Sequence, residues 1–169
     1  MTYLGALIVV ISALSLGVFK AKEERTKTKT LCELCSMLEM FENEICTNRT
    51  PLGKVISARS MKSLVLLRPF LSSMQSGFKD LGDRRFFDIW SESINNTLML
   101  LPEKSKSELI KLGNSLGRYD SDLQRNAIER CMSVLRSECE ELESGLKNNE
   151  KMYIGLSGGA GLILALMLI

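Results

Sequence analysis

Charged side chains occur only in the middle of this chain, from Lys20 to Lys151. The flanking stretches, residues 1–19 and 152–169, are apolar and carry no charge. A helix needs about 20 apolar residues to cross the hydrocarbon core of a bilayer, and each stretch comes close to that length. The pattern therefore predicts one transmembrane helix at each end of the chain, with residues 20–151 between them.

The basic residues next to the two apolar stretches indicate their orientation. They lie on the inner side of both stretches: Lys20, Lys22, Arg25, Lys27 and Lys29 after the first, and Lys147 and Lys151 before the second. A signal peptide carries its positive charge before the apolar run, so a retained anchor is favoured over a cleaved leader. Because basic residues stay on the cytoplasmic side, we expect a multi-pass protein of the cell membrane whose middle lies in the cytoplasm.

The middle of the chain has the hydrophobic spacing of α-helices. One expected helix face consists of apolar residues at alternating intervals of 3 and 4: Leu31, Leu34, Leu38, Phe41 and Ile45. No sustained alternation typical of strands occurs. We therefore predict an all-α fold with a bundle of roughly six helices over residues 31–151. Residues 20–30 are either a charged linker or a helical continuation of the first span.

Prolines, glycines and polar residues mark the expected helix boundaries. Thr50 is expected to cap a helix that begins at Pro51, and Pro69 to begin the next one. The other expected boundaries are a loop over residues 82–85, an end at Pro102, a C-cap at Gly117 and an N-cap at Asp120 or Ser121. The last helix is expected to bury Leu123, Ala127, Cys131, Val134 or Leu135, Leu142 and Leu146.

Charge balance and residue types narrow the chemistry. The chain has 22 basic and 20 acidic residues, and this net charge of +2 is too balanced for a nucleic-acid-binding protein. It has no histidine, which removes the commonest general base and the commonest zinc ligand. No phosphate-binding loop or nucleophile motif occurs. We therefore expect neither an enzyme nor a bound cofactor.

Five cysteines form an odd set, and disulfides are not expected in a reducing cytoplasm. Cys32 and Cys35 form a C-x-x-C motif, but a zinc site would need two further ligands at suitable spacing. A redox motif of this kind is typically found beside a strand, which a helical chain lacks. The sequence favours small apolar or half-exposed cysteines over a metal site.

Residues 138–143 carry four glutamates on the last expected helix. Paired carboxylates can perform acid–base chemistry, but successive helical residues fan around the axis instead of converging. The pattern favours a solvated helix face over a docking surface for a basic partner.

Small residues recur in the second apolar stretch, where Gly155 and Gly159 form a G-x-x-x-G motif and Gly161 continues a second row. In lipid, such rows let helices approach closely. Two alternatives stay open: packing against Ala13 and Gly17 of the first stretch, or contact with another copy or another membrane protein.

Several motifs together resemble the stage III sporulation protein AB family of endospore-forming bacteria. They extend over nearly the whole chain: Leu4, Gly5 and Ala6; Glu44 and Ile45; Thr50, Pro51 and Leu52; Trp90; and the run from Leu112 to Gln124. The most specific part is Leu116-Gly117-Arg118 with Asp120, Asp122 and Gln124. The order and spacing of these motifs carry the resemblance.

The resemblance implies a non-enzymatic membrane component of the channel complex that joins mother cell and forespore. The soluble bundle of that family is similar to the F-type platform proteins of type II secretion and type IV pilus systems. By this analogy, the bundle docks a hexameric secretion-type ATPase and the spans pack against other channel subunits. Such platform proteins usually carry two bundles and more spans, so self-association of this chain stays open.

The candidate partner-binding residues are Arg118, Asp120, Asp122 and Gln124, at the expected corner between the last two helices. The structural alternative makes Asp120 an N-cap and Arg118 a partner of Asp122 or of a carbonyl. Two other functions compete with the sporulation channel. One is an F-type platform fragment of a secretion or pilus system, and the other is a membrane-anchored signalling adaptor.

Overall fold

The computed structural model describes residues 2–57, 61, 63–80, 82–116 and 121–168, and for residues 2–11, 13–14, 16, 121 and 146–168 it describes the backbone alone. The described residues form six α-helices and no strand, which confirms the all-α prediction. The helices are α1 (Thr2–Phe41), α2 (Leu52–Ser57), α3 (Arg68–Gly77), α4 (Phe86–Thr97), α5 (Glu103–Gly113) and α6 (Ser121–Leu168). A π-helix, η1 (Glu42–Thr47), and a 3₁₀ turn, η3 (Phe78–Asp80), extend α1 and α3.

The chain forms two compact units. The first unit joins residues 1–28 with residues 140–169, so both ends of the chain belong to it. The second unit, residues 29–139, is the helical bundle. Within the part of the chain that the structure describes, none of the helices combines the length and apolar character that crossing a bilayer requires. The spans expected over residues 1–19 and 152–169 stay predictions.

Residues 20–30 are helical and belong to α1, so they continue the helix and do not form an irregular linker. Ion pairs one helical turn apart support this stretch. The Lys27 ammonium lies 2.9 Å from Glu24 Oε1 and 3.2 Å from Glu23 Oε1, and Lys20 lies 3.6 Å from Glu24. Pairs of opposite charge at these spacings stabilise a helix modestly.

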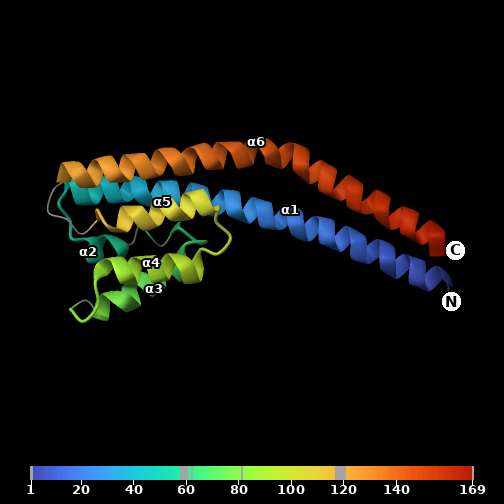
Figure 1. Cartoon of the computed structure of the whole chain (residues 1–169), viewed down its shortest axis with the longest axis horizontal. Helices are drawn as coiled ribbons and strands as arrows, with labels where there is room; N and C mark the ends of the chain where they lie inside the picture. The colour runs from blue at the N-terminus through green and yellow to red at the C-terminus, as the bar shows by residue number, and fades with distance from the viewer. Residues whose placement is uncertain (1, 58–60, 62, 81, 117–120, 169) are drawn as a thin grey trace. The chain divides into compact units, whose positions relative to one another are not determined.

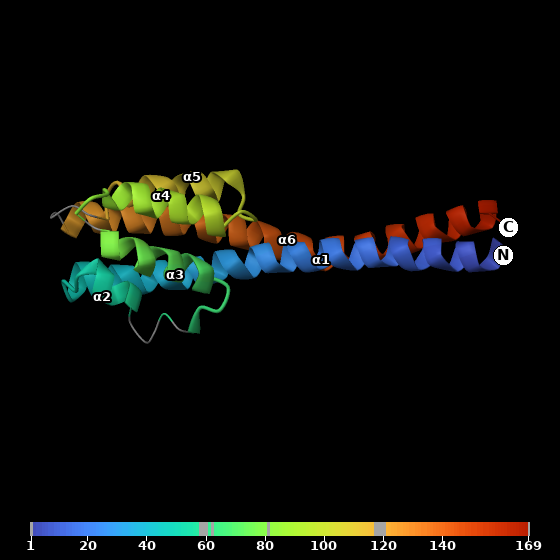
Figure 2. The ribbon, with the colours of Figure 1, turned by 90° about the horizontal axis from the view of Figure 1, so that it is seen from below.

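Inside the bundle, α3, α4 and α5 follow one another with alternating direction (Figure 1). The view from below shows the same order of helices (Figure 2). Pro69 lies in the first turn of α3 as predicted, because its missing N–H is not needed there. The helix expected to reach Pro102 ends earlier, at Thr97. Leu98 and Leu101 are buried in the following turn instead.

Trp90 lies at the centre of the bundle core and is fully buried. Its ring packs edge-on against Phe70 at a centroid distance of 5.3 Å, and Phe86 lies 5.8 Å away. The indole Nε1–H donates a 2.7 Å hydrogen bond to the carbonyl oxygen of Leu109 on α5. A Cβ atom on Gly113 would lie 2.3 Å from Trp90 Cδ1, so only glycine permits this close approach of α5.

The buried face of α6 differs from the predicted one. It consists of Gln124, Ile128, Cys131, Leu135 and Cys139. The predicted Leu123 is 51% exposed and Ala127 is half-buried, whereas Cys131 and Leu135 are buried as predicted. One residue along a helix turns the face by about 100°. The prediction favoured the apolar Leu123 over the polar Gln124, whose burial depends on a hydrogen-bond partner outside α6.

The structure joins Cys32 of α1 and Cys139 of α6 in a disulfide, which contradicts the expectation of no disulfide. The two Cα atoms lie 6.4 Å apart although the residues are separated by 107 positions in sequence. Sequence spacing could not reveal this pair, because it depends on which helices become neighbours. Cys35, the second cysteine of the C-x-x-C motif, is a buried free thiol.

Glu33, between these cysteines, holds the connection before α3. Its Oε2 accepts hydrogen bonds from the backbone N–H groups of Leu66, at 2.8 Å, and Leu67, at 3.2 Å. The first N–H groups of a helix have no partner within the helix. The Glu33 carboxylate thus accepts hydrogen bonds from N–H groups just before α3, and this contact joins the start of α3 to α1.

Ser105 provides a stability prediction, because its buried hydroxyl has no hydrogen-bond partner among the described residues. An unsatisfied buried polar group costs about 1–3 kcal/mol, so Ser105→Ala should raise the free energy of unfolding by about 1 kcal/mol or more. Ser93 is the matched control, since its equally buried hydroxyl lies 2.8 Å from the Ser73 hydroxyl.

We therefore expect Ser93→Ala to lower the free energy of unfolding while Ser105→Ala raises it. Urea unfolding followed by circular dichroism measures both changes. A loss of stability in Ser105→Ala would show that this hydroxyl has a partner.

Candidate partner-binding end of the bundle

Two of the sequence motifs, one after α1 and one at the start of α6, lie at the same end of the bundle. The end of α1, with η1 and the turn into α2, lies beside the first turns of α6 (Figures 1 and 2). Arg125 on α6 bridges the two segments, with its Nε atom 3.9 Å from Glu42 Oε1. Residues 42–52 and 121–125 are far apart in the sequence, so this convergence is a property of the fold. We refer to these two segments together as the motif end.

The turn between η1 and α2 is closed by Glu44 and Thr50. The Thr50 hydroxyl donates a 2.9 Å hydrogen bond to Glu44 Oε2, and the Thr50 backbone N–H donates to the Glu44 carbonyl oxygen at 2.8 Å. Arg49 between them has a φ of 54°, a left-handed conformation uncommon for a residue with a side chain. The double contact of Glu44 with Thr50 therefore holds the turn in a conformation that the local sequence disfavours.

The predicted N-cap role of Thr50 is wrong. The carbonyl oxygen of Pro51 accepts the first hydrogen bonds of α2, from Lys54 and Val55, so Pro51 is the capping residue. The Thr50 hydroxyl donates to the carboxylate of Glu44, six residues earlier in the chain.

Four residues were predicted as partner-binding candidates. Arg118 and Asp120 lie outside the described residues. Asp122 is exposed in the first turn of α6, where it is accessible to a partner. Gln124 is only 6% exposed, and its side-chain amide donates a 3.2 Å hydrogen bond to the Leu116 carbonyl oxygen. This hydrogen bond gives a donor to a backbone carbonyl in the turn after α5, and it favours a structural role for Gln124.

The sequence motifs do not indicate Arg125 and Glu42, because neither residue lies on a patterned apolar face. Both side chains are partly exposed, 44% for Arg125 and 31% for Glu42. One signal in the sequence could indicate Arg125: it is a basic residue one helical turn before the apolar Ile128. Together with Asp122, they make the motif end a mixed-charge surface, which suits a protein partner better than nucleic acid.

The free cysteines lack the activation that a nucleophile needs. Burial raises the pKa of the Cys131 thiol to about 12. Burial also raises the pKa values of Cys35 and Cys46, although Arg125 acts in the opposite direction on Cys46. Reactive cysteines have lowered pKa values, because the thiolate is the nucleophile. These three side chains are therefore neutral, unreactive thiols at neutral pH.

The acidic stretch over residues 138–143 is used partly by the bundle itself. Glu138 Oε1 accepts a 3.1 Å hydrogen bond from the Lys104 ammonium of α5, and its side chain is 14% exposed. Glu140 and Glu141 are exposed, as expected for a solvated face. For Gly155, Gly159 and Gly161 the structure describes the backbone alone, so their packing role stays a prediction.

Comparison with known proteins gives one consistent match. The sequence profile of the family described as stage III sporulation protein AB matches residues 2–169. The chain is 30% identical over 169 residues to the stage III sporulation protein AB of Bacillus subtilis (strain 168), covering 98% of this chain and 97% of the relative. A solved structure of stage III sporulation protein AB (SpoIIIAB) has a similar fold. Its TM-score is 0.56 at 18% identity, over 72% of this chain and 97% of that one.

Proposed function

Because the chain belongs to the stage III sporulation protein AB family, we propose that it is a non-enzymatic membrane subunit of the channel complex joining mother cell and forespore. A role in sporulation follows from the family, and this favours the sporulation channel over a secretion or pilus system. The neutral, buried thiols and the absence of histidine support an adaptor more than a catalyst.

The proposed membrane attachment rests on the sequence. The uncharged stretches 1–19 and 152–169 serve as spans, and their basic inner flanks favour a cytoplasmic bundle on the mother-cell side. Residues 1–28 and 140–169 belong to one compact unit, which supports packing of the two spans against each other within one chain. Gly155 and Gly159 would then allow close approach to the first span.

The bundle is proposed to dock a hexameric secretion-type ATPase through the motif end. The observation that carries this proposal is the convergence of two distant motif segments, linked through Arg125 and Glu42. The Glu44–Thr50 contact holds the turn on one side of this surface in place. This turn therefore loses little conformational entropy when a partner binds. Asp122 and Arg125 supply exposed charges of both signs, which favour a specific orientation of the partner.

Binding of the full-length chain, purified in detergent, to the secretion-type ATPase of the same genome tests this function. We expect saturable binding, and we expect Asp122→Ala to weaken it by roughly tenfold, because a hydrogen bond to a charged group contributes about 1.5–3 kcal/mol. Arg118→Ala should weaken binding to a similar extent without lowering the melting temperature. Biolayer interferometry gives the dissociation constants.

Glu103→Ala is the matched control. Glu103 occupies the first turn of α5 as Asp122 occupies the first turn of α6, so both substitutions remove one carboxylate from a helix start. Glu103 lies away from the motif end, and its replacement should leave ATPase binding unchanged. Equal losses in the two variants, or no binding by the wild type at high micromolar concentration, would contradict docking through this surface. A melting temperature lowered by several degrees in Arg118→Ala would make that residue structural.

A further inference from the structure

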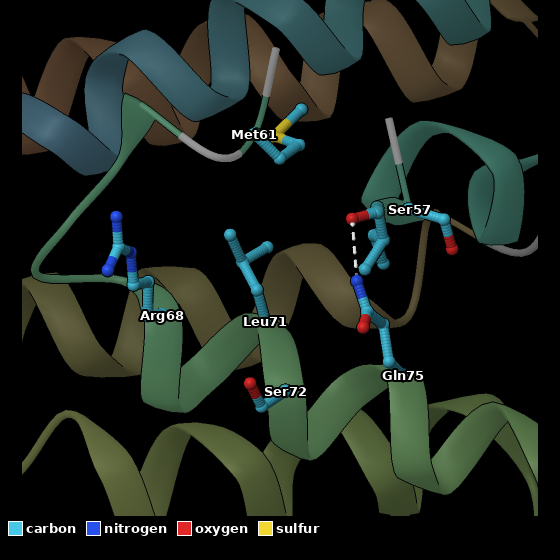
Figure 3. A pocket seen from close by; sticks show the side chains of 7 residues that line it. Ser57, Met61, Arg68, Leu71, Ser72 and Gln75 are labelled. Atoms are coloured by element: carbon cyan, nitrogen blue, oxygen red, sulfur yellow. Dashed lines mark hydrogen bonds between the residues drawn. The ribbon is translucent and has the colours of Figure 1, made fainter. Parts of the chain in front are cut away.

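A pocket of about 300 Å³ lies between α2 and α3 (Figure 3). None of the described residues that line it belongs to the motif end. Arg68, Leu71 and Gln75 line it from one face of α3, at the spacing of successive helical turns. Ile56 of α2 and Met61 of the following connection line the other side. These residues belong to none of the sequence motifs, and the proposed ATPase docking does not use them.

The floor of the pocket is apolar and belongs to the bundle core. Ile56, Met61 and Leu71 are each at most 5% exposed, so their positions are set by packing and not by solvent. The Gln75 side-chain amide donates a 3.2 Å hydrogen bond to the Ile56 carbonyl oxygen and so joins the two walls (Figure 3). A ligand would therefore find the cavity already formed and would not need to open the bundle.

The charge at the rim is positive. Arg68 is exposed beside the apolar floor, and within the described part of the chain its guanidinium has no ion-pair partner. Among the described residues that line the pocket, none carries a carboxylate. The nearby Glu33 carboxylate is taken by the N–H groups of Leu66 and Leu67. An unpaired guanidinium presents several donors in a fixed geometry that matches a carboxylate.

Size and composition together define the ligand. Pockets for small molecules and cofactors have volumes of about 300–1,000 Å³, so this one is at the lower limit and suits one or two side chains. An apolar floor with a single cationic rim fits an aliphatic side chain with a carboxylate beside it. We propose that this pocket is a second docking site of the bundle, which binds a partner segment carrying an aliphatic residue next to an acidic one.

Methionine methyl NMR on the full-length chain in detergent tests the site, because Met61 lies in the pocket and Met99, 73% exposed, lies outside it. The probe is the peptide acetyl-Ala-Glu-Leu-Ala-amide. We expect it to shift the Met61 methyl resonance saturably and to leave Met99 unchanged. The matched peptide with glutamine in place of glutamate should bind at least roughly tenfold more weakly, since it loses the charged hydrogen bond.

Arg68→Gln should remove this preference for the acidic peptide, while Arg85→Gln on another exposed turn should retain it. The other methionine resonances of Arg68→Gln should stay in place, which shows that the variant is folded. Equal binding of the two peptides by the wild type, or no shift of Met61 up to the solubility limit, would overturn the proposal. An equal shift of Met61 by inorganic phosphate alone would also overturn it, because the site would then bind any anion. Binding of the ATPase is measured separately and does not affect these outcomes.

Discussion

Replacing Trp90 with alanine should lower the free energy of unfolding by about 3–5 kcal/mol, the range found for large aromatic residues in protein cores. Trp90 contacts three aromatic rings, Phe41, Phe70 and Phe86, and its removal leaves a cavity among α1, α3 and α4. The same change also leaves the Leu109 carbonyl oxygen without its donor. Typical domains are stable by only about 5–15 kcal/mol, so this single change removes a large share of the total.

Trp90→Phe separates packing from hydrogen bonding. It keeps most of the aromatic contact and loses the indole N–H, so we expect a smaller loss of about 1–3 kcal/mol. Because Trp90 is the only tryptophan, unfolding is followed by circular dichroism and not by fluorescence. Losses below about 1 kcal/mol in Trp90→Ala would contradict the central position of this side chain in the core.

Reduction of the Cys32–Cys139 disulfide should produce the second large effect. The bridge closes a loop with a sequence separation of 107 residues. Constraining a loop of this length in the unfolded chain stabilises the folded state by about 4.7 kcal/mol in the chain-entropy model, and measured values are typically about 2–4 kcal/mol. We therefore expect a reducing agent to lower the stability of the purified, oxidised protein by at least about 2 kcal/mol.

The cysteine variants make this test specific. Cys32→Ser and Cys139→Ser should abolish the effect of the reducing agent, while Cys46→Ser should retain it, because Cys46 is a free thiol. In the proposed cytoplasmic location the cellular thiol pool keeps such pairs reduced. The bridge is thus expected after purification in air. An unchanged stability on reduction of the wild type would show that the two thiols do not pair.

The candidate site shows how far motif reasoning extends. Asp122 was found from a local motif, and its exposure agrees with a surface role. Gln124 was found from the same motif, but its side chain turns inward to the Leu116 carbonyl oxygen. Two residues apart on a helix differ by about 200° in direction, so neighbours in one motif can have opposite environments. Only the packing of α6 decides which of them faces a partner.

Some properties of this protein follow from the sequence by itself. The helical spacing from Leu31 to Ile45, the start of α3 near Pro69 and the confinement of charge to residues 20–151 are all readable without a structure. Each depends on interactions within about one or two helical turns, or on composition alone. The absence of histidine likewise limits the chemistry regardless of the fold.

Other properties were decided only by the tertiary structure. The structure sets which face of α6 is buried. It also joins residues that are tens of positions apart: Cys32 with Cys139, Glu33 with the start of α3, and Glu42 with Arg125. Local helix preferences are the same whichever helices become neighbours. The choice among neighbours is made by burial of the apolar faces around Trp90, together with partners for buried polar groups such as Gln124.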